Sequence, residues 1–192
     1  MAQPREKPKT VENILTERDI VRLLKACRNK REAFVVGGLV FTGMRVSEFI
    51  HMDRSWIRDG AIHIPRSKRC SCLECAKKGG IWTPKTPSSI RVIPIVPEIQ
   101  TLFSEFFSEY NSVMELIPNR QKAHYIIRDV GKRINKKVFP HSLRGTFATI
   151  LAKKGFNPFE IKDVMGWSKI DIAMSYISMV GTYVKEAFRQ KW

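Results

Sequence analysis

The stretch Thr42-Gly43-Met44-Arg45-Val46-Ser47-Glu48 puts an arginine directly after a glycine turn and at the start of a helix. Before it, residues 33–41 are mostly apolar, and after it residues 46–50 carry apolar side chains with helical spacing. These patterns predict two helices that meet at Gly43, with Arg45 at the junction. Taken alone, such an arginine is as readily a surface residue as a site residue, so the rest of the chain decides its meaning.

A second stretch, His141-Ser142-Leu143-Arg144-Gly145-Thr146, pairs a histidine with an arginine three residues later. On a helix, that spacing puts both side chains on one face or at its leading edge. Arginine suits phosphate because its planar fork bonds two oxygens at once and stays charged. A neutral imidazole beside it can accept or donate a proton. The two stretches together predict a site that holds one phosphate between Arg45 and Arg144.

Three more positions complete the pattern: Lys85, Trp167 directly after a glycine, and Tyr176 nine residues beyond Trp167. With the two stretches above, they resemble the catalytic residues of the tyrosine recombinases, the phage-type integrase family. The resemblance covers residues 16–184, nearly the whole chain. It implies a mixed fold, mostly α with a small antiparallel β-sheet, which is the tyrosine-recombinase catalytic-domain fold.

The resemblance also implies a role for each residue. Tyr176 attacks a DNA phosphate and forms a 3′-phosphotyrosyl bond, while Arg45 and Arg144 neutralise the charge on that phosphate. His141 supports phosphate binding and acid–base chemistry, and Lys85 protonates the departing 5′ oxygen. No cofactor is required for catalysis, because the phosphotyrosine stores the energy of the broken bond.

The nucleophile has a rival on its own predicted helix. Tyr176 and Tyr183 share one helical stripe, and such stripes are usually core. The spacing from Trp167 matches the family for Tyr176 and not for Tyr183. Trp167 itself stands where histidine is more common in the family. Its indole N–H can hold a phosphate oxygen but cannot exchange a proton near neutral pH.

Two supporting assignments also keep alternatives. Lys85 competes with Lys77 and Lys78 in a segment rich in cations, and its position in the predicted strand–turn region favours it. Glu48 lies one helical turn after Arg45, where it would orient Arg45 or Lys85, although a plain surface glutamate fits the same position.

Composition points to a polyanionic partner. The 192 residues carry a formal net charge of +16, and 43% are hydrophobic, which is enough for a packed core. We expect double-stranded DNA as the partner and no membrane, because the longest apolar run is too short to span a bilayer. With no N-terminal targeting signal apparent, the expected location is the cytoplasm, or the host cytoplasm for a viral or mobile-element protein. The residues expected to contact DNA are Arg66, Lys68, Arg69, Lys77, Lys78 and Arg91.

The remaining patterns predict the order of elements. A helix is expected from Thr16, and a hairpin over residues 57–64. Two strands over residues 81–85 and 90–95 are expected to pair across a turn, and helices follow from Pro97 onward. We assign residues 1–13 to a flexible N-terminal lead and residues 14–192 to the tyrosine recombinase catalytic domain.

Three cysteines, Cys70, Cys72 and Cys75, are not part of the family pattern. Their spacing fits ligands of a structural zinc ion, which prefers four ligands. His63, Cys27 or water would have to supply the fourth. A redox pair of Cys72 and Cys75, or free thiols in a loop, are the alternatives.

The sequence therefore favours a site-specific DNA recombinase or integrase of the kind used in viral genome integration and by mobile elements. The alternatives are a DNA-binding accessory protein without cleavage and a type IB topoisomerase-like enzyme. By resemblance, four copies would form a homo-tetramer on DNA at synapsis, with a monomer in free solution. Residues 184–192 carry apolar side chains at helical spacing, which predicts docking on a neighbouring protomer or on their own domain.

Overall fold

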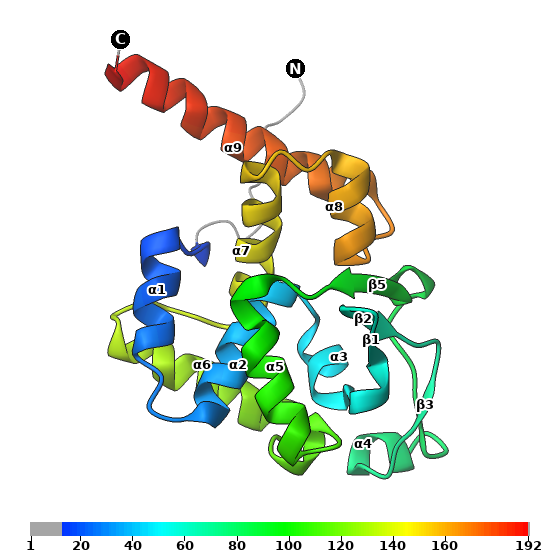
Figure 1. Cartoon of the computed structure of the whole chain (residues 1–192). Helices are drawn as coiled ribbons and strands as arrows, with labels where there is room; N and C mark the ends of the chain where they lie inside the picture. The colour runs from blue at the N-terminus through cyan, green and yellow to red at the C-terminus, as the bar shows by residue number, and fades with distance from the viewer. Residues whose placement is uncertain (1–12, 192) are drawn as a thin grey trace.

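The computed structural model describes the backbone of residues 13–191 and the side chains of residues 13–181 (Figure 1). Its helices are α1 (Glu17–Lys25), α2 (Lys30–Thr42), α3 (Val46–His51), α4 (Leu73–Ala76), α5 (Pro97–Glu109), α6 (Arg120–Arg133), α7 (Pro140–Lys153), α8 (Pro158–Met165) and α9 (Ile170–Lys191). Its strands are β1 (Ile57–Arg58), β2 (Ala61–Ile64), β3 (Lys68–Arg69), β4 (Ile81–Trp82) and β5 (Arg91–Pro94). Short 3-10 turns span Arg54–Trp56, Pro87–Ser89 and Val113–Glu115. The predicted fold class, mostly helical with a small antiparallel sheet, is confirmed.

Two of the predicted segments lie largely outside these described residues. The N-terminal lead, predicted over residues 1–13, overlaps them only at its last residue. The side chains of residues 184–192 and of Tyr183 also lie outside them. Among the helices that the structure does describe, none is long and apolar enough to cross a membrane.

Capping residues fix where the first helices begin and end. Thr16 accepts a hydrogen bond from the backbone N–H of Asp19 at 3.1 Å, and the Asp19 carboxylate accepts one from the Thr16 N–H at 3.2 Å. α2 ends at Gly43, whose φ of 58° lies in the left-handed region that favours glycine. α3 begins directly after Arg45. The predicted junction of two helices at Gly43 is therefore confirmed.

The strands form two small antiparallel sheets. In the first, β2 lies between β1 and β5, with Ile62 opposite Ile57 on one side and opposite Ile93 on the other. In the second, β3 pairs with β4, and Lys68 lies opposite Trp82. The chain between β2 and β5 therefore forms a separate hairpin of β3 and β4, with α4 at its tip.

The predicted pairing of residues 81–85 with residues 90–95 is wrong. β4 ends at Trp82 and pairs with β3, while β5 pairs with β2. Pro84 and Pro87 lie between the two strands and have no backbone N–H to donate, so this segment does not form a ladder. Within this segment Ser89 is buried and accepts a hydrogen bond from Arg45.

Two hydrophobic clusters hold the helices together. In the larger one, α2 packs against α1, α5, α6 and α7, and the Phe34 ring stacks on Phe106 with centroids 3.7 Å apart. The smaller cluster joins α7, α8 and α9 through residues that include Phe147, Met165 and Tyr176. Because α7 contacts both α2 and α9, it connects the two clusters. Beyond this contact, α9 leads away from the body of the molecule (Figure 1).

The junction at Gly43 predicts a specific stability effect. An added Cβ would collide with the Phe147 ring and come within 3.0 Å of Met165 Sδ, in a backbone conformation that side chains rarely adopt. We expect Gly43→Ala to lower the free energy of unfolding by about 3 kcal/mol, from strain and overpacking together. Gly60→Ala is the matched control, because its φ is 69° but nothing lies within 4 Å of the added Cβ. It should cost only about 1 kcal/mol in urea unfolding; equal losses would show that packing at Gly43 is not what matters.

Candidate active site

A cleft of about 1500 Å³ opens between the segment that follows β4 and the helices α6 and α7. Arg45, Lys85, His141 and Arg144 all line it, although they come from separate parts of the sequence. Its other acidic and basic lining residues are mostly cations: Lys78, Arg120, Arg128, Lys132, Lys136 and Lys137, against the carboxylates of Glu48 and Glu74. This excess of positive charge in a concave surface attracts a polyanion.

Arg144 is almost fully buried, with 6% of its surface exposed. Its two terminal nitrogens donate hydrogen bonds to the carbonyls of Gly43 and Met165. These carbonyls lie at the C-terminal ends of α2 and α8, where a helix carries partial negative charge that stabilises a cation. Burial, and then the charges of Arg45 and Arg91, lower the pKa of Arg144 to about 9. The guanidinium therefore remains charged at neutral pH.

Arg45 is held in a similar way, by a carbonyl at the end of α8 and by two side chains. It donates to Glu48 Oε1 at 2.8 Å, to Ser89 Oγ at 2.9 Å and to the Gly166 carbonyl at 3.0 Å. Gly166 follows α8 with a φ of 62°, so this helix also ends on a glycine in the left-handed region. The Arg45 side chain keeps 21% of its surface exposed. The end of α8 thus contacts both Arg45 and Arg144.

Glu48 is the buried carboxylate among these arginines, with 1% of its surface exposed. It accepts hydrogen bonds from Arg45 at 2.8 Å and from Arg91 at 3.0 Å. Burial alone would raise the pKa of Glu48, but the charges of Arg91, Arg144 and Arg45 outweigh it and hold that pKa below its usual value. Glu48 is therefore a carboxylate at neutral pH, and of its two predicted partners it contacts Arg45.

Two residues predicted to contact DNA are instead paired inside the protein. The Arg91 side chain is 5% exposed, and besides Glu48 it bonds the carbonyls of residues 89 and 164. Lys68 donates to the His51 carbonyl at 2.8 Å and pairs with Asp53 at 2.7 Å. Their cationic groups compensate internal acceptors, so these two predictions need correction. The other four residues predicted to contact DNA are exposed, and Lys78 among them lines the cleft: Arg66, Arg69, Lys77 and Lys78.

The cationic face of α6 was not predicted from the sequence. Arg120, His124, Arg128 and Lys132 are exposed and line the cleft. They recur at every fourth residue, and that spacing puts side chains on one face of a helix. The four-residue period was the signal that could have found them.

His141 and Lys85 are the exposed members of the predicted set. His141 is the second residue of α7, where it faces the cleft. Burial lowers the pKa of His141, and the nearby cations Arg144, His124, Arg45 and Lys85 lower it further. The imidazole is therefore neutral at neutral pH and able to accept a proton. Lys85 lies on the opposite wall, between β4 and the 3-10 turn over residues 87–89.

Trp167 and Tyr176 lie behind Arg144 rather than in the lining of the cleft. The Arg144 guanidinium lies 5.7 Å from the centre of the Trp167 ring, and that ring stacks on Tyr176 with centroids 5.4 Å apart and an interplanar angle of 13°. Tyr176 is 7% exposed. Burial raises the pKa of its phenol, and the charge of Arg144 opposes that rise. The phenol is therefore protonated and sheltered in this conformation.

The three cysteines lie together, and Cys75 lines the cleft with the neighbouring His51. The Sγ atoms of Cys70, Cys72 and Cys75 and a ring nitrogen of His51 all lie within 4.8 Å of one another. His63 and Cys27, which were expected to supply the fourth ligand, are not in this group; His51 takes that place. His51 ends α3, and the sequence did not point to it because three strands, β1, β2 and β3, separate it from the cysteines along the chain.

The model of the phage integrase family matches residues 13–180 of this chain. Tyrosine recombinase XerA of Pyrococcus furiosus is 27% identical, over 94% of this chain and 62% of its own length. The transposase from transposon Tn916 of Enterococcus faecalis is 26% identical, over 88% of this chain and 47% of its own length. This chain therefore spans less than two-thirds of either relative.

Solved structures share the fold. The crystal structure of XerA recombinase superposes with a TM-score of 0.72 at 20% identity, covering 98% of this chain and 66% of that one. The Tn1549 transposon integrase in complex with transposon right end DNA gives 0.69 at 20% identity, covering 91% and 63%. The catalytic domain of bacteriophage HP1 integrase gives 0.56 at 22% identity, covering 92% and 93%.

The buried charge cluster predicts a pH-dependent stability effect. Glu48→Gln removes the one carboxylate among three guanidinium groups, and we expect a loss of about 3 kcal/mol at neutral pH. Because the folded pKa of Glu48 is lowered, its contribution is full above the unfolded value and is lost as the pH falls. The difference between the wild-type protein and the variant should therefore shrink below about pH 4.

Urea unfolding at a series of pH values measures this difference. The control is Glu17→Gln, whose side chain is 80% exposed and 3.9 Å from Lys153. It should change stability by less than about 0.5 kcal/mol at any pH. A Glu48→Gln loss that does not vary between neutral and acidic pH would contradict the assignment of a charged Glu48.

Proposed function

The chain belongs to the phage integrase family, and from this we propose that it is a site-specific DNA recombinase that cleaves and rejoins DNA through a 3′-phosphotyrosyl intermediate. The observation that carries the proposal is the convergence of Arg45, Lys85, His141 and Arg144 on one cationic cleft. The Trp167 ring contacts both Tyr176 and the Arg144 guanidinium. Phosphoryl transfer needs neutralised oxygens, a deprotonated nucleophile and a protonated leaving group, and this set contains a group for each task.

The arginines would bind the phosphate through donors that the protein leaves available. Arg144 has five N–H donors, and two of them bond carbonyls of the described residues. Three are left for the non-bridging oxygens of a phosphodiester. Because both guanidinium groups are already fixed by the ends of α2 and α8, little ordering is needed when DNA binds. Preorganised donors of this kind are the largest source of transition-state stabilisation in many enzymes.

The proton transfers would fall to the two exposed groups. Neutral His141 accepts the proton of the Tyr176 hydroxyl as its oxygen attacks phosphorus. Lys85, on the opposite wall, gives a proton to the 5′ oxygen as the P–O5′ bond breaks. A 5′ hydroxyl from a second strand then attacks the phosphotyrosine, rejoins the DNA and returns the phenol. In this proposal Trp167 holds Arg144 and the phenol in line and takes no proton.

Attack also requires a movement. Tyr176 is buried and does not line the cleft, so its hydroxyl has to turn toward Arg144 before it can reach a bound phosphate. α9 contacts the rest of the protein through α7 and α8. A shift of α9 along these two helices would bring the phenol forward while Trp167 keeps its place. The sheltered phenol would then form adducts only on DNA that stabilises the shifted state.

Duplex DNA is the proposed partner, and the α6 row is the proposed backbone contact. Residues 14–192 would form the catalytic domain, and four copies would act on two DNA sites at synapsis, in the cytoplasm of the cell that holds the DNA. The cations of α6 and the exposed cations of the β3–β4 hairpin lie on either side of the cleft. Contacts to phosphates from both sides would position the duplex without reading its sequence.

The α6 row predicts a change in the salt dependence of DNA binding. A double variant, Arg128→Ala with Lys132→Ala, removes two phosphate contacts. The slope of log affinity against log salt should therefore become shallower by about 2, equally for unrelated duplexes. Lys30→Ala is the control, because Lys30 is 77% exposed, pairs with Glu105 and does not line the cleft. An unchanged slope in the double variant would remove α6 from the DNA-binding surface.

The nucleophile is tested with a nicked duplex whose cleaved flap diffuses away, so that covalent adducts accumulate. Tyr176→Phe removes only the hydroxyl and should abolish adducts while leaving DNA affinity unchanged. Tyr125→Phe is the matched control, because Tyr125 is a cleft-lining tyrosine that is 56% exposed. Tyr125→Phe and Tyr183→Phe should both retain adducts. Arg144→Ala should slow adduct formation about 10²–10³-fold.

The outcomes separate the alternatives. Adducts that persist in Tyr176→Phe would reject the assignment of the nucleophile. No adduct from the wild-type protein, with DNA binding intact, would favour an accessory DNA-binding protein. Adducts together with relaxation of a supercoiled plasmid and no strand exchange between sites would favour a topoisomerase-like activity.

A further inference from the structure

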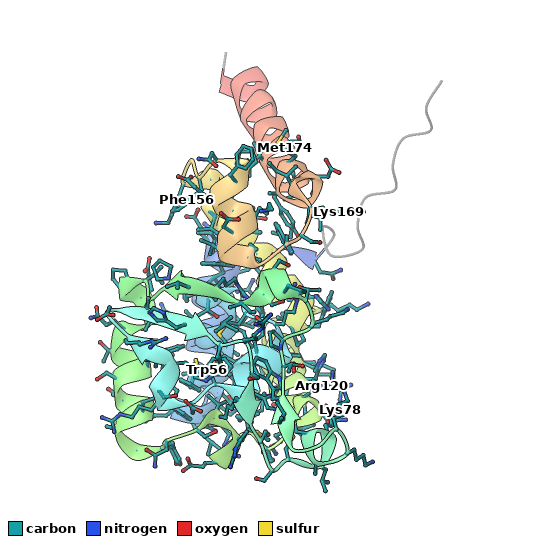
Figure 2. All side chains as sticks on the ribbon, turned by 90° about the vertical axis from the view of Figure 1, so that its right-hand side faces the viewer. Trp56, Lys78, Arg120, Phe156, Lys169 and Met174 are labelled. Carbon is teal, nitrogen blue, oxygen red and sulfur yellow. The ribbon has the colours of Figure 1, made fainter. Side chains whose placement is uncertain are left out.

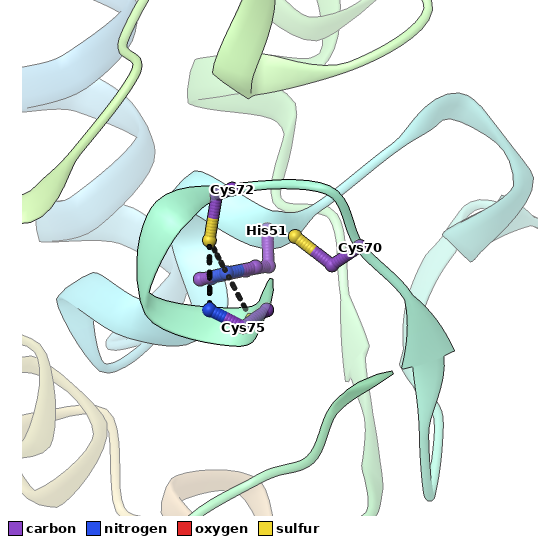
Figure 3. A group of neighbouring side chains, drawn as sticks. All are labelled: His51, Cys70, Cys72 and Cys75. Atoms are coloured by element: carbon purple, nitrogen blue, oxygen red, sulfur yellow. Dashed lines mark hydrogen bonds between the residues drawn. The ribbon is translucent and has the colours of Figure 1, made fainter. Parts of the chain in front are cut away.

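Four side chains that could bind one metal ion meet in the structure, and two of them, His51 and Cys75, line the cleft. Cys70, Cys72 and Cys75 come from the β3–β4 hairpin and His51 comes from the end of α3 (Figure 3). The ligand atoms all lie within 4.8 Å of one another, and His51 and Cys75 are buried. A single ion between them would be reached by all four. The proposed recombination chemistry uses none of these side chains.

The two nitrogen–sulfur distances from His51 to Cys72 and Cys75 fit tetrahedral coordination. His51 Nε2 lies 3.6 Å from Cys72 Sγ and 3.5 Å from Cys75 Sγ. With typical zinc–sulfur and zinc–nitrogen bond lengths, a tetrahedral site has nitrogen–sulfur edges of about 3.5 Å. The observed edges therefore leave the right room for zinc without moving either cysteine.

The hydrogen bonds around the ligands prepare them to bind a metal. His51 Nδ1 lies 2.7 Å from the Ser47 carbonyl, and a carbonyl can only accept, so the proton is on Nδ1 and the Nε2 lone pair faces the sulfurs. The backbone N–H of Cys75 donates to Cys72 Sγ at 3.4 Å. Such a donor favours a thiolate over a thiol, and the thiolate is the form that binds zinc.

The hairpin has few buried apolar side chains of its own, although Trp82 packs into the core and Lys68 pairs with Asp53. β3 and β4 pair over two residues each, and such a short ladder is not stable by itself. Two large apolar side chains of the excursion, Leu73 and Ile81, are 83% and 49% exposed. Small segments with too few apolar contacts are commonly held by a structural metal.

We propose that Cys70, Cys72, Cys75 and His51 bind one zinc ion, which fastens the β3–β4 hairpin to α3 and thereby fixes the wall of the cleft that carries Lys85. Trp82 transmits this constraint. Its ring stacks on His51 with centroids 5.3 Å apart, and its Nε1 donates to Ser47 Oγ at 3.3 Å. Lys85 follows three residues later along the chain. The ion would thus tie the Lys85 wall to the helix that begins after Arg45.

Zinc is the metal that this donor set favours. Three thiolates and one imidazole in a tetrahedron form a closed structural site with no position for water. The four ligands come from both the hairpin and α3, so a metal here joins two segments rather than closing one loop. His51, Cys70, Cys72 and Cys75 are positioning residues in this proposal, because the proposed phosphoryl transfer uses none of them.

Metal analysis of the protein purified under reducing conditions tests the site. We expect about one equivalent of zinc, and cobalt substitution should give the visible absorption bands of a tetrahedral thiolate site. Cys72→Ser and His51→Ala should weaken zinc binding more than about 100-fold in competition with a chromophoric chelator. His51→Cys keeps four ligands and should retain zinc. Cys27→Ser is the control, because Cys27 follows α1 and is not one of the four clustered residues. This variant should still bind one equivalent of zinc.

The link to the cleft wall is tested by amide hydrogen exchange with and without zinc. Removal of zinc should speed exchange over residues 66–85 at least about 10-fold and leave the amides of α5, remote from the hairpin, unchanged. This readout does not depend on DNA cleavage, so it stands or fails separately from the proposed function. A reduced protein that neither contains nor takes up zinc overturns the site, as does iron in its place or a Cys72–Cys75 disulfide in the native protein. Zinc that leaves exchange over residues 81–85 unchanged overturns the link to Lys85.

Discussion

Arg45, Arg91 and Arg144 lie around one buried carboxylate, Glu48, and their mutual repulsion has to be offset inside the protein. Glu48 supplies one negative charge. The rest comes from backbone carbonyls at the C-terminal ends of α2 and α8, which have no partner within their own helices and carry the negative end of the helix dipole. Because dipoles rather than further carboxylates compensate the cations, the site keeps a net positive charge. Such a site can bind an anion tightly without first releasing an internal partner.

This arrangement dictates how the second half of the chain packs. The end of α8 has to lie against the end of α2, so α7 lies beside α2 and its Arg144 reaches both carbonyls. The turn after α8 then carries Trp167 over Arg144, and α9 returns along α7 and α8 so that Tyr176 stacks on Trp167. Figure 2 shows this upper layer, with Phe156, Lys169 and Met174, standing on the larger body that holds Trp56, Lys78 and Arg120. The nucleophile proposed for this family member is therefore placed by the same charges that would bind its substrate.

The cleft has a second wall with a different kind of support. Arg45, Arg144 and Glu48 are fixed by buried ion pairs and helix ends, whereas Lys85 follows a hairpin with little apolar packing of its own. The contact that joins the two walls runs through His51 and Trp82 to α3. A metal at His51 and the three cysteines would make the weaker wall as rigid as the stronger one. Catalytic groups on opposite walls keep their separation only when both walls are fixed.

The sequence by itself determined where the first helix begins, the junction at Gly43, and four of the residues that line the cleft, because caps, left-handed glycines and local spacing act over a few residues. Those four are Arg45, Lys85, His141 and Arg144. Thr16 and Gly43 are examples in which a local rule leaves one structure favoured. It did not determine that β4 pairs with β3, that Arg91 turns inward to Glu48, or that His51 joins the cysteines. Each of these contacts depends on which segments, distant in the sequence, pack together. The packing decides which group lies close enough to pair with a buried charge or a thiol. Only the tertiary structure decided those partners, since the free energy of burying a polar group depends on the whole set of groups around it.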